Sequence, residues 1–318
     1  MDLELSEDES ALQEGLRSFL DGRFDMATVR AQADGLDRAR WTELAETGVF
    51  GLRLSEDEGG VGLGVTEAVL AFEELGRSLV PGPVLATHLA AGLVDGAADG
   101  TCVVGLVERP AGVLLIEHVD ALDRLLAIDT EGIWAIDLDG LATEAVARPL
   151  DPLTPLHRVV GLPRGELIAP ADVAAEWALI GAALTSAALL GIAARTTELA
   201  VAYAGQREQF GKPIGSFQAV KHLCADMLTR AELARGVVYA AGVTLDGRGV
   251  DDAARLVSAA KITAGDAAKG NGKACIQVHG GMGFTAEVDA HLYLKRAIVL
   301  DTWFGSVDDH SEAVALSL

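Results

Sequence analysis

Apolar residues recur at helical spacing in the first part of the chain, residues 5–85. Ser6 precedes an amphipathic run, and Glu9 follows it by three residues, which is the pattern of a capping box at a helix N-terminus. The same spacing predicts three more helices, at residues 38–46, 66–76 and 84–99. Thr66 is the predicted N-cap of the third helix.

Four glycines between the second and third of these helices predict a loop, at positions 59, 60, 62 and 64. A glycine cluster is also typical of a phosphate-binding loop. Neither a strand-to-helix unit nor a following Lys-Ser or Lys-Thr surrounds these glycines, so the phosphate-binding interpretation is weak.

From Thr101 to Ala169 the pattern changes to short apolar runs, rich in β-branched residues and separated by Gly, Asp or Pro. Their length and composition predict strands at 101–107, 112–119, 124–130 and 132–138. Trp134 lies in the last of these strands, and we interpret it as a core residue.

The remainder of the chain returns to helical spacing. Residues 171–205 are apolar almost all round, which predicts a long helix buried on several sides. Ser216 is the predicted N-cap of a helix that extends towards Leu245. Two further helices and a glycine loop follow, together with a short last helix: 251–272, the loop at 275–287, and 288–304. Four long helices with short links predict an antiparallel bundle.

The chain therefore reads as three domains, a helical one over 1–100, a small β module over 101–170 and a four-helix bundle over 171–318. We expect a mainly α fold with a small β domain.

Composition limits the classes of partner. A net charge of -22 and a pI of about 4.6 disfavour binding to nucleic acid or to an anionic membrane. The three cysteines have no metal-ligand spacing and cannot all pair, which fits a reducing compartment. The acidic N-terminus is unlike a signal peptide, and no uncharged apolar run approaches the length that spans a bilayer. We expect a cytoplasmic protein without membrane insertion or a metal.

Basic residues gather at one point of this acidic chain, in the stretch 203–222. Arg207 lies there with Lys212 and Lys221, between two predicted helices. The arginine fork is well suited to a phosphate, because it donates two parallel hydrogen bonds. From these residues alone, a candidate anion site and an ordinary turn with a solvated arginine both remain open.

Two motifs together carry a resemblance to a known family. REQFGKPIGSFQAVKH, followed about sixty residues later by QVHGGMGFTAE, resembles the C-terminal domain of the acyl-CoA dehydrogenase family. SEDEGGVGLGVTEAVLAFEELGRSLV resembles the helical N-terminal domain of that family. The order of helices, β module and bundle also matches, so the resemblance covers nearly the whole chain.

The resemblance implies FAD as the cofactor and names the residues that contact it. It implies that Arg207, in the motif that also holds Phe210, reaches across a subunit interface to the pyrophosphate of a FAD held mainly by a neighbouring subunit. Phe217 and Gln218 would lie near the adenine end. The Q-x-x-G-G segment would contact the same cofactor with Gln277, Val278, His279, Gly280 and Gly281. For His279, a phosphate donor and a packed histidine remain open.

Departures from the family pattern matter equally. Family enzymes use a glutamate to remove a proton beside the thioester, at one of two positions that correspond here to Gly305 and Gly181. Glycine cannot act as a base, although it leaves room and tolerates a distorted backbone. The β module also lacks the family's segments that surround the flavin ring.

The resemblance thus implies a subunit without its own base, in a heterotetramer of α2β2 type with a full-length acyl-CoA dehydrogenase-like partner. The implied substrate is an acyl-CoA, with a sterol-derived thioester suggested, and the implied acceptor is electron-transfer flavoprotein or a similar protein. Two alternatives stay open: a homo-oligomeric dehydrogenase with a relocated base such as Asp301, and a helical scaffold without flavin. We interpret three other polar candidates as structural or solvated, namely Glu176, Glu287 and His222. For Lys212, support of the field around an anion and simple exposure both stay open.

Overall fold

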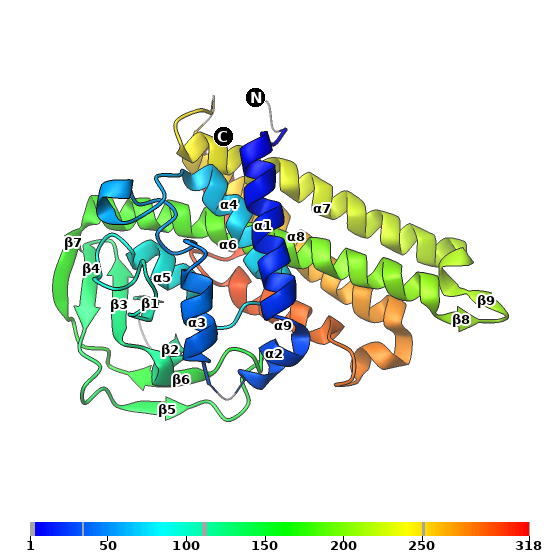
Figure 1. The fold of residues 1–318 in the computed structure, drawn as a ribbon, viewed down its shortest axis with the longest axis horizontal. Coiled ribbons are helices and arrows are strands. Elements are labelled where there is room, and N and C mark those ends of the chain that lie inside the picture. Colours follow the sequence, from blue (N-terminus) through cyan, green and yellow to red (C-terminus); the bar gives the residue numbers. More distant parts are fainter. Residues whose placement is uncertain (1–3, 34, 110–112, 250–251, 318) are drawn as a thin grey trace. The chain divides into compact units, whose positions relative to one another are not determined.

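The chain folds into helices and two small sheets in a computed structural model that describes residues 4–33, 35–109, 113–249 and 252–317 (Figure 1). It forms two compact units, each discontinuous in sequence. Unit 1 comprises residues 1–17, 69–79 and 182–318, and unit 2 comprises residues 18–68 and 80–181. The division into three domains stays a prediction.

Three helices contribute residues to both units: α1 (Glu7–Arg23), α4 (Val65–Arg77) and α6 (Ala171–Gln206). The other helices of unit 2 are short, and they are α2 (Met26–Ala31), α3 (Arg38–Ala45), η1 (Glu56–Glu58), α5 (Val84–Ala90) and η2 (Val119–Ala121). Only the first half of the helix predicted over 84–99 is therefore confirmed, since turns follow Ala90.

The β module lies in unit 2 and contains two sheets. The first has the order β1 (Val104–Glu108), β3 (Arg124–Asp129), β4 (Gly132–Ile136) and β7 (Glu166–Pro170). Only its β1–β3 pair is parallel. The second sheet is antiparallel, with the order β2 (Val113–Glu117), β6 (Leu156–Val160) and β5 (Thr143–Ala145). The four predicted strands are confirmed, apart from residue 112, which lies outside the described residues.

Trp134 is a core residue, as its position in a strand predicts. Its side chain is buried between the two sheets' apolar residues, and its indole N–H donates to Asp129 Oδ1 at 3.1 Å. The Arg164 guanidinium lies 4.6 Å above the ring. These contacts are internal to the β module, so they describe a packing residue.

Unit 1 is a helical bundle formed by the second part of α6 with α7 (Gln218–Leu245), α8 (Ala253–His279), α9 (Ala290–Asp301) and α10 (Val307–Ser317). Asn271 joins three of these helices, because its fully buried amide donates to Ala193 O on α6 and to Met227 O on α7. The bundle prediction is confirmed. The predicted start of the third bundle helix, residue 251, lies outside the described residues.

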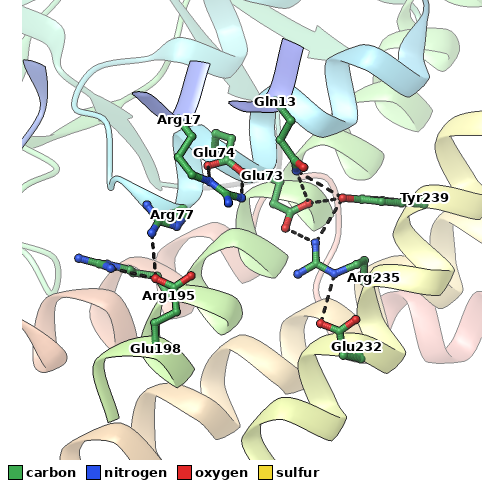
Figure 2. Close-up of polar contacts among 10 residues, drawn as sticks. All are labelled: Gln13, Arg17, Glu73, Glu74, Arg77, Arg195, Glu198, Glu232, Arg235 and Tyr239. Atoms are coloured by element: carbon green, nitrogen blue, oxygen red, sulfur yellow. Dashed lines mark hydrogen bonds and ion pairs between the residues drawn. The ribbon is translucent and has the colours of Figure 1, made fainter. Parts of the chain in front are cut away.

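Two adjacent buried carboxylates on α4 link this helix to α1 and to α7 (Figure 2). Glu74 is fully buried and accepts two hydrogen bonds from the Arg17 guanidinium, at 2.6 and 2.8 Å. Glu73, 1% exposed, pairs with Arg235 and accepts from the Tyr239 hydroxyl at 2.7 Å. Each carboxylate is thus neutralised by an arginine from another helix, which offsets the cost of desolvating it.

Glycines allow α4 and α6 to approach closely within unit 1. A Cβ at Gly76 would collide with the carbonyl oxygen of Ala188, and one at Gly191 would collide with the carbonyl oxygen of Glu73. The helix backbones can therefore touch only because both positions lack a side chain.

Of the three predicted N-caps, one is confirmed. Ser6 and Glu9 form the expected reciprocal pair, at 2.7 and 3.2 Å. Thr66 is not a cap, because α4 begins at Val65 and Glu67 bonds the amide of Gly64. Ser216 is not a cap either, because Phe217 holds the N-cap position of α7. Propensity for a cap does not decide where the preceding chain turns.

The statement that no apolar run reaches the length of a membrane span is wrong for α6. By length and composition this helix could cross a membrane, but 83% of its most apolar window is buried inside the protein. Its apolarity is therefore explained by its position as a core helix.

We predict that Gly191→Ala destabilises the protein by about 3 kcal/mol, because the new methyl group meets the α4 backbone, which cannot move aside. Thermal unfolding measures the effect. Gly236→Ala is the matched control, since its Cβ faces open space on another bundle helix, and we expect a small gain of up to about 1 kcal/mol. Equal effects of the two substitutions would contradict the close helix contact.

We also predict a loss of stability on acidification that depends on His88. Burial lowers the pKa of this imidazole to about 4, while its Nδ1–H donates to Val49 O at 2.9 Å. The unfolded chain takes up this proton below about pH 6.5 and the folded one only near pH 4, so stability falls across that interval by about 3 kcal/mol.

Urea unfolding of the wild type and of His88→Asn, between pH 7 and pH 4, measures that contribution. Asparagine keeps a donor for the Val49 carbonyl without titrating. We expect the stability difference between the two proteins to change by the stated amount over the interval. Parallel pH profiles would show that His88 charges freely in the folded protein.

Candidate functional site

A short β-hairpin joins α6 to α7, in place of the simple turn that the sequence predicts. Its strands are β8 (Glu208–Gln209) and β9 (Lys212–Pro213), and Figure 1 shows it at the end of the two helices. Phe210 and Gly211 form the turn with φ of +55° and +76°. Two consecutive positive φ angles are typical of a type I′ hairpin turn. This geometry leaves the Phe210 side chain 92% exposed.

The backbone of Arg207 is hydrogen-bonded, whereas its side chain has no partner among the described residues. Its N–H donates to Tyr203 O and its C=O accepts from Ile214 N–H, both at 2.8 Å. Within the described residues, its exposed guanidinium has no hydrogen bond or ion pair. Lys212 lies in the same hairpin, and its ammonium is 4.4 Å from the Phe217 ring. These two cations outnumber the one carboxylate of the hairpin, that of Glu208, so the hairpin is locally electropositive in an acidic protein.

The N-terminus of α7 adds backbone donors at the same place. Because Phe217 caps the helix without a side-chain hydrogen bond, the amides of Gln218 and Ala219 have no acceptor among the described groups. The Gln218 side chain is exposed. Free amides at the start of a 28-residue helix favour an anion.

The second predicted segment, 277–281, is only partly a loop. Gln277, Val278 and His279 form the last turn of α8, and a 3-10 helix η4 (Gly280–Phe284) follows. The Gly280 amide donates to Gln277 O, so it is not an available donor. Gly283 is required for packing, since a Cβ there would meet the Ile276 carbonyl. Gly281, in contrast, is exposed, and a Cβ there would have open space around it.

His279 is buried, whereas Arg207 and Gln218 are exposed. Its ring is buried and stacks on Tyr203, with centroids 4.1 Å apart, and its Nδ1 contacts Cys275 O at 2.8 Å. A carbonyl only accepts, so Nδ1 carries the proton and Nε2 is the acceptor in the neutral ring. The structure favours a packed histidine. Gln277 is exposed and Val278 is buried in the core beneath.

The predicted residues therefore fall into two groups at one end of the bundle. Arg207, Phe210, Phe217 and Gln218 surround the hairpin, where Phe210 and Phe217 meet edge to face at 6.1 Å. Residues 277–281 end α8, and the Tyr203–His279 stack connects the two groups. Tyr203 was not predicted as a site residue. Its position four residues before Arg207, on the same helical face, is the signal that would have indicated it.

Two acidic side chains near the expected base positions, Asp301 and Glu176, are each paired with a cation. Gly181 is buried within α6. Asp301, the candidate relocated base, accepts a hydrogen bond from Lys269 at 2.8 Å and packs against Gly265. Glu176 pairs with Arg53 at 3.6 Å. These contacts favour structural roles. Within the described part of the chain, no group of three or more His, Cys, Asp or Glu side chains is arranged to hold a metal ion.

Comparison with known proteins identifies related sequences. Residues 6–98 match the family model described as acyl-CoA dehydrogenase, N-terminal domain, and residues 172–318 match acyl-CoA dehydrogenase, C-terminal domain. Acyl-CoA dehydrogenase IpdE2 of Mycobacterium tuberculosis is 35% identical over 92% of this chain and 91% of its own length. Acyl-CoA dehydrogenase FadE34 of the same organism is 39% identical over 80% of this chain, which spans only 38% of FadE34.

Solved structures share the fold. One, described as the ChsE4-ChsE5 complex from Mycobacterium tuberculosis, has a TM-score of 0.84 at 22% identity and covers 100% of this chain and 99% of its own. Another, described as a steroid ACAD variant of Tcur3481-Tcur3483, has a TM-score of 0.82 at 22% identity, with 97% of each chain covered. At this identity the likeness concerns the fold alone.

Proposed function

This chain belongs to the acyl-CoA dehydrogenase family, whose cofactor is FAD, and from that premise we propose that it is the non-catalytic subunit of a hetero-oligomeric acyl-CoA dehydrogenase. In this proposal it completes the FAD site of a full-length partner. The partner supplies the base, the contacts to the flavin ring and the acyl pocket.

The observation that carries the proposal is a set of anion-binding groups that have no anionic partner among the described residues. Arg207 has an unused guanidinium, Gln218 and Ala219 have unused amides, and Lys212 adds a positive charge. These groups fit a pyrophosphate, which takes a bidentate cation together with backbone amides. A scaffold without flavin has no need for them.

Exposure of the surrounding aromatic residues supports a partner. Phe210 is 92% exposed and Phe284, in η4, is 82% exposed, whereas apolar side chains of this size are usually buried in a monomer. Both belong to the segments that carry the predicted cofactor residues. In the proposed complex, they pack against the partner and exclude water from the phosphate contact.

Glycine at both expected base positions supports a complex in which the partner supplies the base. When bound, FAD accepts a hydride from the carbon β to the thioester, and a carboxylate takes the proton from the α carbon. Position 305 and position 181 are both glycine here, and Asp301 is engaged by Lys269. The proposed role of this chain is therefore to hold the cofactor's phosphates, and each pair of subunits would have one working flavin site.

For the substrate, we propose a CoA thioester derived from a steroid. The support is the similarity to a fold described as a steroid ACAD, and the hetero-oligomer has parallel support from the fold described as the ChsE4-ChsE5 complex. The α2β2 assembly, the cytoplasmic location and an electron-transfer flavoprotein as acceptor remain predictions. A neighbouring reading frame that encodes a longer acyl-CoA dehydrogenase-like chain with an intact glutamate would support the partner assignment.

We predict that Arg207→Ala in the co-expressed complex weakens FAD binding by roughly 30-fold, which corresponds to about 2 kcal/mol for the loss of a charge-assisted fork. Arg207→Lys keeps the charge without the fork and should be intermediate. Flavin absorbance per complex, and FAD titration of the stripped complex, measure the effect.

Arg248→Ala is the control for the loss of one exposed arginine, because Arg248 follows the opposite end of α7 and pairs with Asp246. It should leave flavin content unchanged. If Arg207→Ala also retains its full flavin content, Arg207 does not bind the cofactor and the proposal loses its main support.

We further predict that the chain expressed alone contains no FAD and does not oxidise acyl-CoA, whereas the complex binds one FAD per two chains. The reason is that this chain presents contacts for one part of the cofactor only. Absorbance at the flavin band against chain concentration measures the ratio. A yellow, active chain without a partner would instead support the homo-oligomeric alternative.

A further inference from the structure

Tyr203 and His279 form a stacked pair of rings that joins the two segments of predicted cofactor residues in unit 1. The ring centroids are 4.1 Å apart, and the ring planes are 26° from parallel. Tyr203 lies on α6 one helical turn before Arg207, whose N–H donates to the Tyr203 carbonyl at 2.8 Å. His279 is the last residue of α8. The stack therefore fixes the end of α8 beside the arginine that is proposed to hold the phosphates.

The contacts of the His279 ring determine which nitrogen carries its proton. Nδ1 lies 2.8 Å from the carbonyl oxygen of Cys275, which only accepts, so Nδ1 is the donor. The Cys275 thiol lies 3.7 Å from the same nitrogen, and a weak donor at that distance cannot offset the repulsion of two acceptors at 2.8 Å. Burial raises the pKa of this thiol to about 12, so it brings no negative charge to the ring. In the neutral ring, Nε2 is therefore an acceptor.

Nε2 reaches the surface, although most of the ring is buried. His279 is 8% exposed. Nε2 has no hydrogen-bond partner among the described residues, and it is not one of their buried side-chain nitrogen or oxygen atoms that lack a partner, so solvent reaches it. Gly280 and Gly281 follow directly, both exposed, and a Cβ at either position would meet no atom within 4 Å. The chain after the ring therefore leaves space for a ligand.

An acceptor in this place suits a hydroxyl and not a phosphate. Phosphate oxygens are themselves acceptors, so a neutral His279 would face them without a proton to share. A hydroxyl donates, and among the donors of FAD the sugar hydroxyls are the nearest to the pyrophosphate. Arg207, the proposed pyrophosphate contact, lies one helical turn from the Tyr203 ring. The two contacts would thus follow the order of phosphate and sugar in the cofactor.

We propose that His279 accepts a hydrogen bond from a sugar hydroxyl of FAD through Nε2, and that Tyr203 is the positioning residue that holds the imidazole for this contact. The inference rests on the proposed function, in which Arg207 holds the pyrophosphate of the same FAD. It deepens that function, because this chain then recognises a sugar hydroxyl of the cofactor in addition to its phosphates.

Titration of the stripped, co-expressed complex with FAD and with deoxy analogues tests the contact. Each analogue lacks one hydroxyl, in one arm from the adenosine ribose and in the other from the ribityl chain. The wild type should bind one analogue roughly 5- to 10-fold more weakly than FAD, and the arm in which this occurs identifies the sugar. His279→Phe keeps a ring for the stack without the acceptor, so it should bind FAD and that analogue with equal affinity. His279→Leu serves as the second variant if His279→Phe does not fold.

Two further pairs of measurements separate this contact from its neighbours. Arg207→Ala should weaken binding of FAD and of the analogue by the same factor, so the preference for FAD remains. Tyr203→Phe keeps the stacked ring and should retain the preference, whereas Tyr203→Leu should lose most of it. A residue that served stability alone would lower Tm without changing the ratio of the two affinities.

Three results overturn the inference. In the first, no deoxy analogue binds the wild type more weakly than FAD does. In the second, the preference for FAD survives in the His279 variants, or those variants weaken FAD and every analogue by one common factor, as a phosphate contact would. In the third, Tyr203→Leu keeps the full preference, which contradicts the positioning role. A wild-type complex that binds no FAD is a different result, because it contradicts the proposed function and the inference falls with it.

Discussion

Burial of two adjacent carboxylates on α4 is the constraint on which unit 1 depends. Glu73 and Glu74 have almost no contact with solvent, and a buried charge is tolerated only with a close partner of opposite sign. Arg235 on α7 and Arg17 on α1 are those partners. Burial raises the pKa of Glu73, and the charge of Arg235 acts in the opposite direction. Removing either arginine would leave an uncompensated charge, a loss of about 3–5 kcal/mol.

The two buried ion pairs explain why α4 packs closely against its neighbours in unit 1. The arginine pairs require α4 to lie close to its neighbours, and the glycines at 76 and 191 permit it. Farther along α6, the core continues through Ala200, Ala204 and the apolar residues of α7 and α8 up to Val278. The hairpin with Arg207 and Phe210 lies beyond this core, and both side chains are exposed. A rigid bundle whose donors at one end have no partner among the described residues is suited to binding an anionic ligand.

Much of this could be predicted from the sequence, and the errors have identifiable causes. Periodicity located the long helices and four of the strands of the β module, because burial on one face or on all faces leaves a direct pattern of apolar residues. The paired motifs selected Arg207 and Gln218 as candidate cofactor contacts before any geometry was available, and that role stays a prediction. The glycine segment was misread at its start, because a helix can continue through Gln277–His279 when Val278 and His279 are buried against α6 and its neighbours. Local sequence carries no direct information about such tertiary contacts.

The sequence by itself determined the family, the helical character of the bundle and the local concentration of positive charge. These follow from residue identity and from spacing along one chain. Only the tertiary structure decided that Arg207 has no partner among the described residues and that the His279 ring stacks on Tyr203. Each of these depends on which side chains meet across elements distant in sequence, and burial, hydrogen bonding and steric exclusion arise only once those elements are packed.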